Sequence, residues 1–372
     1  LAVTNGAALV THPATGEILA MVGSTNYFAS PSGNFNVTTA LRQPGSSIKP
    51  INYAIGLDKH IVTPSTMFLD VPTCFANLDK PNYCPKNYDG KFHGPVQLRM
   101  ALGNSYNIPA VKMLYLNTVR DMVASASAFG LDTLTDPSRY GLSLTLGGGE
   151  VRMVDMAEAF GVFANSGIRK DLVSILKVTD RNGKILLEYK DPNLNKEIPS
   201  QLLLQGTRVV GPETAFLISH ILLDNNARQD AFGPASSLFI PGHAVSVKTG
   251  TTDDLRDNWT IGYTPQYVVA TWVGNNDNSQ MNSTLVSGVT GAAPIWNKIM
   301  KKVLKDKPDV WPKQPDGIVG AQICVITGLQ PPNPDAEDRG CATRFEYFIK
   351  GTVPSQRENI KRQVLIDKAT GD

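Results

Sequence analysis

Three short patterns occur in one order along the chain, and together they constrain its fold and chemistry more than any other feature. They are Ser46-Ser47-Ile48-Lys49, Ser105-Tyr106-Asn107 and Lys248-Thr249-Gly250-Thr251. The set supplies a serine with a lysine three residues on, a Ser/Asn pair, and a lysine followed by hydroxyl side chains. These are the groups that acyl transfer through a covalent serine ester needs, in a site that also binds a substrate carboxylate.

The first pattern predicts a nucleophile beside its base. Ser46 follows the turn pair Pro44-Gly45 and precedes an apolar stretch. A helix is therefore predicted to begin near Ser46 or Ser47, with Pro50 close to its first turn. Residues three apart share a helix face, so we expect the Lys49 amine beside the Ser46 hydroxyl, where burial and nearby positive charge would lower its pKa. Taken alone, a capping serine and an exposed lysine explain this pattern better.

The second pattern, Ser105-Tyr106-Asn107, falls on a predicted turn between two helical stretches. A hydroxyl at that place can pass a proton between Ser46, Lys49 and a leaving amine. The Asn107 amide can both donate to and accept from a peptide bond of a substrate. Helix capping by Ser105 or Asn107 is the alternative explanation of this pattern on its own.

The third pattern ends a β-branched run on a predicted strand. Alternation places Lys248 and Gly250 on one face and Thr249 and Thr251 on the other, unless the strand bulges at the glycine. Gly250 is expected to let a substrate approach the backbone closely, and the Lys248 charge with the threonine hydroxyls suits a carboxylate. The backbone N–H groups of Thr251 and Ser46 are expected to form an oxyanion hole. A solvated strand end is the alternative.

Hydrophobic patterning predicts a mixture of hairpins, helices and a strand meander. Hairpins are predicted at residues 7–23 and 175–189, and the meander at 244–248, 259–263 and 267–273. Helices are predicted from about residue 46 and at 97–102, 109–116, 120–129, 151–165, 213–223 and 293–304. Residues 64–95 are rich in Pro, Asn and Tyr and contain two cysteines, which predicts a long loop cross-linked by a disulfide. Glycines 147–149 predict a tight turn, because no Lys-Ser/Thr follows them as in a phosphate loop.

Composition excludes several classes of function. The 372 residues carry a net charge of +2, which gives no footprint for nucleic acid. No apolar run approaches the ~18 residues of a membrane span. The five histidines lack the spacing of metal ligands, so no metal site is expected, and a site from Cys74, Cys84 and His93 is the minor alternative. The chain starts at Leu1 without an initiating Met or a signal peptide, which predicts a piece of a longer or processed protein.

The four cysteines fall as local pairs, Cys74 with Cys84 and Cys324 with Cys341. Local pairs in loop-like sequence fit two disulfides formed in an oxidising compartment. Free buried thiols are the alternative explanation of the same residues.

The three patterns in this order and context resemble the transpeptidase domain of class A, bifunctional penicillin-binding proteins. The resemblance covers about residues 1–305 and is looser after Trp311. It extends beyond the three patterns to the segments Thr15–Gly23, Arg42–Pro50, Leu144–Gly148, Arg256–Trp259 and Gly262–Pro265.

This resemblance implies an α/β fold of the α+β type. A central antiparallel sheet would carry helices on both faces, and an all-helical subdomain would bear the Ser-x-Asn pattern. Residues 1–305 would form the penicillin-binding transpeptidase domain, and residues 306–372 a Pro-rich C-terminal extension or small module.

The resemblance also implies a role for each residue of the patterns. Ser46 would be the nucleophile, Lys49 its base and Ser105 a proton shuttle, with Lys248 completing the catalytic group. Asn107 would contact the substrate amide, and Thr249, Gly250 and Thr251 would bind the substrate. The enzyme would be a D,D-transpeptidase that cross-links peptidoglycan stem peptides through an acyl-enzyme formed on D-Ala-D-Ala, and β-lactams would acylate it.

Partners and location follow from the same resemblance. The partners would be a D-Ala-D-Ala donor peptide, an amine acceptor and β-lactam antibiotics, without nucleic acid, metal or cofactor. A glycosyltransferase domain would precede this one in the intact protein. The protein would face the extracytoplasmic side of a bacterial cell envelope and be anchored in the cytoplasmic membrane by a segment missing from this chain.

Three other serine-acylated functions would use the same patterns, and the sequence argues against the first of them. A class A type β-lactamase needs a glutamate that activates the deacylating water, and no Glu-x-x-Leu-Asn element occurs between Asn107 and Lys248. A β-lactam sensor acylated without turnover would use the same nucleophile, although a shorter chain is then expected. A D,D-carboxypeptidase would use the same site with water as the acceptor.

Overall fold

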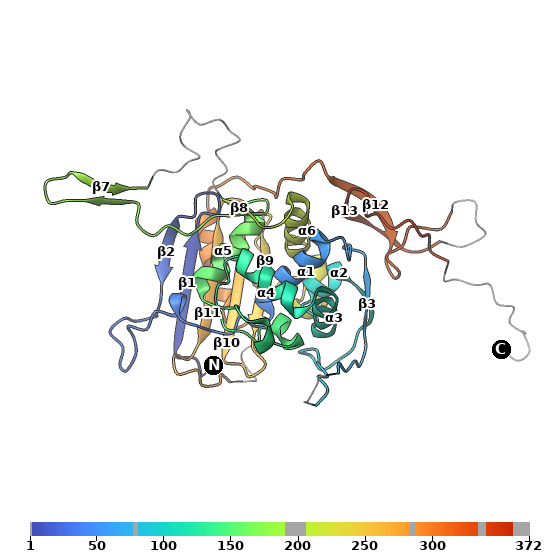
Figure 1. Cartoon of the computed structure of the whole chain (residues 1–372), viewed down its shortest axis with the longest axis horizontal. Helices are drawn as coiled ribbons and strands as arrows, with labels where there is room; N and C mark the ends of the chain where they lie inside the picture. Colours follow the sequence, from blue (N-terminus) through green and yellow to red (C-terminus); the bar gives the residue numbers. More distant parts are fainter. Residues whose placement is uncertain (1, 77–80, 190–205, 283–287, 334–339, 360–372) are drawn as a thin grey trace, which may run out of the picture.

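A five-stranded antiparallel sheet forms the centre of the protein, in a computed structural model that describes residues 2–76, 81–189, 206–282, 288–333 and 340–359 (Figure 1). The strand order is β2-β1-β11-β10-β9. The N-terminal hairpin pairs with the late meander, since Leu9 of β1 lies opposite Ala270 of β11. β9 has β10 as its neighbour and forms one edge of the sheet. The strand bounds are β1 Asn5–Thr11, β2 Ile18–Val22, β9 Ser246–Thr251, β10 Asp257–Tyr263 and β11 Val268–Gly274.

Helices cover both faces of this sheet, because successive strand side chains point to opposite faces. On one face, Leu9 packs in the large core that includes α5 (Met153–Ala164) and α6 (Pro212–Leu223). On the other face, Val10 packs in a second core with Trp296 of α8 (Ala293–Leu304). The predicted α/β class, with a central antiparallel sheet between helices, is confirmed.

A helical group beside the sheet carries the first two sequence patterns. Its helices are α1 (Lys49–Asp58), α2 (Leu98–Gly103), α3 (Asn107–Asn117) and α4 (Val119–Ala128). α1 is its buried centre, since every residue from Lys49 to Leu57 is buried. The predicted helix near Ser46 begins as a 3₁₀ turn at Gly45–Ile48, and Pro50 lies in the first turn of α1, where a missing N–H breaks no helical bond.

The region predicted as a long cross-linked loop, residues 64–95, contains regular structure as well. β3 (Met67–Asp70) pairs with β4 (Gly94–Gln97), and its residues alternate between exposed and buried. The other short elements are β5 (Ile168–Arg169) with β8 (Thr207–Arg208), α7 (Gln229–Phe232), and β6 (Lys177–Thr179) with β7 (Ile185–Glu188). The β6–β7 pair is the second predicted hairpin, and it projects from the body of the molecule in Figure 1.

The chain beyond α8 forms a second antiparallel pair, β12 (Ile318–Cys324) with β13 (Thr343–Ile349). The sequence predicted a Pro-rich extension or small module here, but its two strands were not predicted. The division into two domains at residue 305 stays a prediction. None of the described helices is long and apolar enough to cross a membrane.

Both predicted disulfides are present. Cys74 is bonded to Cys84 within the segment between β3 and β4, and Cys324 to Cys341 at one end of the β12–β13 pair. The alternative of free buried thiols is therefore wrong, since no cysteine is free.

A buried ion pair fastens the β12–β13 pair to the helical group. Arg99 of α2 donates to both carboxylate oxygens of Glu346 on β13, at 2.8 Å and 2.5 Å. The Arg99 side chain is 3% exposed and the Glu346 side chain 0%. Burial opposes the charge of Glu346, but hydrogen bonds and charge from Arg99 and Arg344 outweigh it and lower the pKa of Glu346. α2 ends at Gly103, two residues before Ser105, so the ion pair helps to fix the position of the chain segment that carries Ser105.

We expect Glu346→Gln to destabilise the protein strongly. The substitution leaves the buried Arg99 with the partly exposed Asp224, 3.2 Å away, as its remaining charged partner. Breaking a buried pair from one side typically costs about 3–5 kcal/mol. Urea unfolding followed by circular dichroism measures the change in the free energy of unfolding. The matched control is Glu188→Gln, which breaks the exposed Lys177–Glu188 pair and should change that free energy by less than about 1 kcal/mol. Equal small effects from both variants would contradict the fastening role.

Candidate active site

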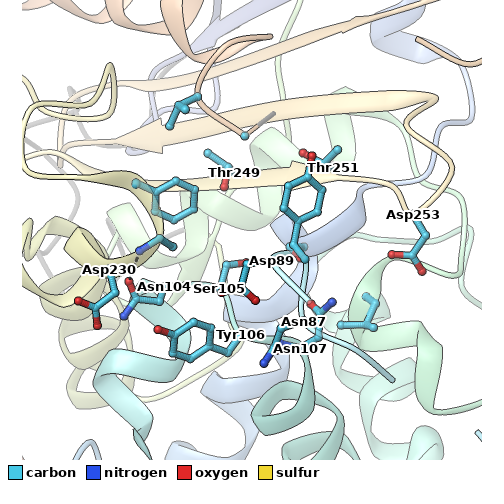
Figure 2. Close-up of a pocket in the computed structure, with 17 residues that line it drawn as sticks. Asn87, Asp89, Asn104, Ser105, Tyr106, Asn107, Asp230, Thr249, Thr251 and Asp253 are labelled. Carbon is cyan, nitrogen blue, oxygen red and sulfur yellow. Dashed lines mark hydrogen bonds between the residues drawn. The ribbon is translucent and has the colours of Figure 1, made fainter. Parts of the chain in front are cut away.

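The three sequence patterns meet at one cavity of about 200 Å³ (Figure 2). The 3₁₀ turn before α1 brings Ser46 to its wall, where the residue is half-buried. The edge strand β9 brings Thr249 and Thr251, and the junction between α2 and α3 brings Ser105 and Asn107. Segments far apart in the sequence therefore form one site. The pattern residues on the cavity wall are Ser46, Ser105, Tyr106, Asn107, Thr249 and Thr251.

Three glycines allow the Ser46 turn to pack closely against its neighbours. Gly45 adopts a φ of 55°, and a Cβ built on it would lie 2.8 Å from the backbone nitrogen of Thr251. A Cβ on Gly250 would lie 2.2 Å from the Pro44 carbonyl oxygen, and one on Gly147 would lie 2.2 Å from the Gly45 nitrogen. A side chain at Gly45 or Gly250 would push the turn away from β9, and one at Gly147 would collide with the turn itself. The chain's own turn thus fills the space beside Gly250, where the sequence led us to expect a substrate.

This packing brings together the two backbone segments that were predicted to form an oxyanion hole. Gly45, which contacts the Thr251 backbone, directly precedes Ser46. The expected alternation along β9 also holds at the threonines, since Thr249 and Thr251 line the cavity. Thr251 Oγ1 accepts a hydrogen bond of 2.9 Å from the Asn258 side chain on β10. The oxyanion hole and the carboxylate-binding role stay predictions.

Ser105 receives hydrogen bonds from two lysines. Lys248 Nζ donates to Ser105 Oγ over 2.7 Å, and Lys49 Nζ donates to the same oxygen over 3.4 Å. Ser105 has a φ of 64°, a left-handed conformation that is unfavourable for a residue with a Cβ. With both lone pairs of the hydroxyl facing amines, its hydrogen is left to donate elsewhere.

Lys49 is completely enclosed and surrounded by oxygen atoms. Its Nζ donates to the Ser105 carbonyl at 2.6 Å, to Asn107 Oδ1 at 2.7 Å and to the Tyr106 carbonyl at 3.2 Å. Among the hydrogen bonds of the described chain, none joins Lys49 Nζ to Ser46 Oγ. In the turn, the Lys49 backbone N–H donates to the Ser46 carbonyl. The predicted position of the Lys49 amine beside the Ser46 hydroxyl stays a prediction.

Both lysines lie where a positive charge is costly. Burial, and then the charge of Lys248, lower the pKa of Lys49 well below its usual range, while Asp253 and Asp70 oppose the shift. Burial, and then the charge of Arg228, lower the pKa of Lys248 to about 7. One proton is therefore readily lost from this pair near neutral pH, which suits a group that must accept a proton from a serine.

Asn107 is tied on both sides of its amide. Its Oδ1 accepts from Lys49, and its Nδ2 donates to the Lys86 carbonyl over 2.7 Å. Its backbone N–H donates to Asn87 Oδ1 over 2.7 Å, at the start of α3. The structure thus gives Asn107 a part in holding Lys49, and its predicted contact with a substrate amide stays a prediction.

Sequence reasoning missed a polar network under the Ser105 turn. Asp70 is fully buried and bonds His93 Nδ1 at 2.6 Å and Asn87 Nδ2 at 2.7 Å. His93 stacks on Tyr106, with ring centroids 3.9 Å apart. No local pattern indicated these residues, because they come from the Pro- and Asn-rich region that is typical of a loop. In the structure Phe68 and Asp70 of β3 face inward together, but the sequence Met-Phe-Leu-Asp shows no alternation of apolar and polar residues that would predict this.

One cluster of metal-binding residue types lies close together among the described residues: Cys324, Cys341 and Glu358. The two cysteines are joined in a disulfide. A disulfide offers no thiolate to a metal ion, so this cluster does not suit metal binding.

Comparison with known proteins identifies the family. The family model "Penicillin binding protein transpeptidase domain" matches residues 6–301, and the model "Penicillin-binding protein 1A, C-terminal domain" matches residues 314–362. The chain belongs to the penicillin-binding protein transpeptidase family, as its sequence patterns predicted.

Two curated relatives show how far the similarity reaches. The chain is 32% identical over 371 residues to penicillin-binding protein 1A of Clostridium botulinum, covering 96% of this chain and 42% of that protein. It is 33% identical over 353 residues to penicillin-binding protein 2D of Bacillus subtilis, covering 92% and 46%. The chain thus spans less than half of the length of these relatives.

Solved structures agree with the fold. Penicillin-binding protein 1A of Haemophilus influenzae superimposes with a TM-score of 0.80 at 29% identity, over 95% of this chain and 54% of that one. PonA1 of Mycobacterium tuberculosis in complex with penicillin V superimposes with a TM-score of 0.66 at 20% identity, over 88% and 84%. The second likeness supports the fold alone.

We expect Gly250→Ala to lower the free energy of unfolding by about 1–3 kcal/mol, because its Cβ would overlap the Pro44 carbonyl. The matched control is Gly141→Ala, since Gly141 has a φ of −116° and a Cβ added there would meet no atom within 4 Å. That control should stay within about 0.5 kcal/mol of the parent protein. Chemical denaturation of the two variants side by side makes the measurement. A Gly250→Ala protein as stable as the control would show that the turn does not depend on this contact.

Proposed function

We propose that the chain is the D,D-transpeptidase domain of a peptidoglycan-synthesising protein and forms an acyl-enzyme at Ser46. The observation that carries the proposal is the pair of buried lysines, Lys49 and Lys248, that meet at Ser105 Oγ beside Ser46. A buried lysine with a lowered pKa is a base, and a serine needs one to become a nucleophile. The family and the relatives named penicillin-binding protein 1A support the same class of reaction.

In the first step, a neutral Lys49 takes the proton from Ser46 Oγ as the oxygen attacks the carbonyl carbon of the penultimate D-Ala. Ser46 Oγ comes within hydrogen-bond reach of Lys49 Nζ when substrate binds, because such contacts often tighten only in the complex. The backbone N–H groups of Ser46 and Thr251 stabilise the oxyanion. The Ser105 hydroxyl passes a proton to the departing D-Ala amine, with Lys248 holding that hydroxyl.

The terminal carboxylate of the donor binds beside β9. Thr249 and Thr251 line the cavity wall. Lys248 is buried, and its amine donates to Ser105 Oγ and to the Thr249 carbonyl. Positive potential with nearby hydroxyl donors favours a carboxylate at this end of the cavity. A β-lactam, which carries a carboxylate and an acylating carbonyl, would occupy the same place and leave a stable ester on Ser46.

Water and an amine are both possible acceptors for such an ester. Among the described residues on the cavity wall there is no glutamate, so the class A type of deacylating base is not available there. We infer that the acyl-enzyme reacts with an amine of a second stem peptide and that hydrolysis is slow. The D,D-carboxypeptidase and the sensor without turnover are the alternatives, and product analysis with a peptide donor and an amine acceptor separates all three.

The setting of the domain is part of the proposal. By analogy with the family, a glycosyltransferase domain and a membrane anchor belong to the intact protein, which acts at the bacterial cell envelope. The two disulfides support an oxidising, extracytoplasmic location.

Ser46→Ala should abolish the covalent adduct with benzylpenicillin, because the acyl group would have no oxygen to bind. Intact mass spectrometry over time measures the adduct, and circular dichroism checks the fold. The matched control is Ser47→Ala, which removes a buried hydroxyl that bonds the Pro44 carbonyl and should keep the adduct. Peptide mapping that places the adduct on Ser47 or Ser105 would overturn the assignment.

A further inference from the structure

The wall of the cavity carries negative groups as well as the lysines. Asp89, Asp230 and Asp253 line it and come from three separate segments (Figure 2). Asp89 bonds His93 at 3.1 Å. Among the ion pairs of the described chain, none includes Asp230 or Asp253. Exposed carboxylates alone do not define a site, so a second observation is needed.

That second observation is an unpaired amide on the same wall. Asn104 is 4% exposed and lines the cavity, and Figure 2 places it between Asp230 and Ser105. Its Oδ1 accepts a hydrogen bond of 3.0 Å from the Ala231 backbone N–H, which fixes the orientation of the amide. Its Nδ2 is buried and has no hydrogen-bond partner. A buried donor without a partner is costly, and an acceptor atom of a ligand would satisfy it.

A second cavity lies next to this corner of the site. It has a volume of about 370 Å³ and shares Tyr106 and Asp230 with the first cavity. It runs between the helical group and the β12–β13 pair, so both parts of the chain build it. Its other lining residues include His93, Met100, Val325 and Arg344.

We propose that Asp230 and Asn104 form the subsite for the amine acceptor, which is a peptide with a free amino group. Asp230 binds the ammonium, Asn104 Nδ2 donates to a carbonyl oxygen of the same peptide, and the rest of the peptide occupies the second cavity. This inference rests on the proposed transpeptidase function and names the second substrate of that site. The lysine end of the first cavity attracts the donor carboxylate, and the Asp230 end attracts the opposite charge.

The transfer step balances with these groups. The bound ammonium releases one proton to solvent, and the neutral nitrogen attacks the carbonyl carbon of the Ser46 ester. The new C–N bond forms, and the bond between that carbon and Ser46 Oγ breaks. The second proton of the nitrogen passes to Ser46 Oγ through the Ser105 and lysine groups. Asp230 and Asn104 are positioning residues here, because they hold the amine within reach of the ester.

The partition of the acyl-enzyme between amine and water tests the subsite. The donor is a benzoyl-D-alanyl thioester, which carries no amine, and the acceptors are an α-N-acetylated lysyl-D-alanine peptide and n-butylamine. Mass spectrometry gives the ratio of transfer to hydrolysis at sub-saturating acceptor. Both products come from one acyl-enzyme, so changes in the rate of acylation cancel in this ratio.

We expect Asp230→Asn to lower the ratio about five- to tenfold with both acceptors, since both carry an ammonium. Asn104→Ala should lower it with the peptide and not with butylamine, which has no carbonyl oxygen. Asp230→Glu, which keeps the charge, should restore part of the ratio. The control is Asp254→Asn, which removes an exposed carboxylate that is paired with Arg256 and does not line the cavity, and which should leave the ratio unchanged.

Two results would overturn the inference. One is a ratio for Asp230→Asn equal to that of the Asp254→Asn control. The other is an Asn104→Ala effect of the same size with butylamine as with the peptide, which would mean a general disturbance of the loop. Failure of the proposed function looks different, because the parent protein would then form no acyl-enzyme from the thioester at all.

Discussion

Two lysine side chains share one enclosed space around a serine hydroxyl, and the rest of the structure depends on holding them there. Lys49 and Lys248 come from a helix start and an edge strand, and both donate to Ser105 Oγ. Removing an ammonium from water is costly, and a second positive charge a few ångströms away adds to that cost. Oxygen acceptors around Lys49 and the negative charges of Asp70 and Asp253 stabilise its ammonium. These partners offset part of the cost, and release of one proton near neutral pH relieves the remainder.

The surrounding architecture serves to keep these groups in register. β9 and the Ser46 turn touch only because glycines stand at positions 45 and 250, so the sheet and the helical group meet with backbone against backbone. The polar network of Asp70, Asn87 and His93 is bonded to the end of the Ser105 turn, because Asn87 Oδ1 accepts from the Asn107 backbone N–H. From the far side, α2 is bonded through Arg99 to Glu346 on β13. The β12–β13 pair therefore contributes to the same assembly as the helices around the cavity.

Much of this organisation was predictable from the sequence. The hairpin at 7–23, the meander and the long helices follow from period-2 and period-3.6 patterning. The three motifs predicted one site for Ser46, Ser105 and Lys248, and in the structure Ser46 and Ser105 line one cavity while Lys248 donates to Ser105. The pairing of β3 with β4 was not predictable, because a Pro- and Asn-rich segment separates two four-residue strands. The close packing of Gly250 against Pro44, and the position of Asn104 and Asp230 on one cavity wall, arise where segments far apart in the sequence meet. A single sequence does not show which distant segments meet, so these features were not predictable.

The central claim is that the two buried lysines titrate far below an ordinary lysine. Nuclear magnetic resonance of lysine labelled with ¹⁵N at Nζ, recorded across a pH series and assigned with Lys49→Arg and Lys248→Arg, measures both amines directly. The account predicts that the pKa of Lys248 is about 7 and that the pKa of Lys49 is well below its usual range. The rate of acylation by benzylpenicillin should rise with pH through the same titration, because the neutral amine is the base. Two amines that keep their protons until about pH 10.4, with an acylation rate indifferent to pH below that value, would contradict it.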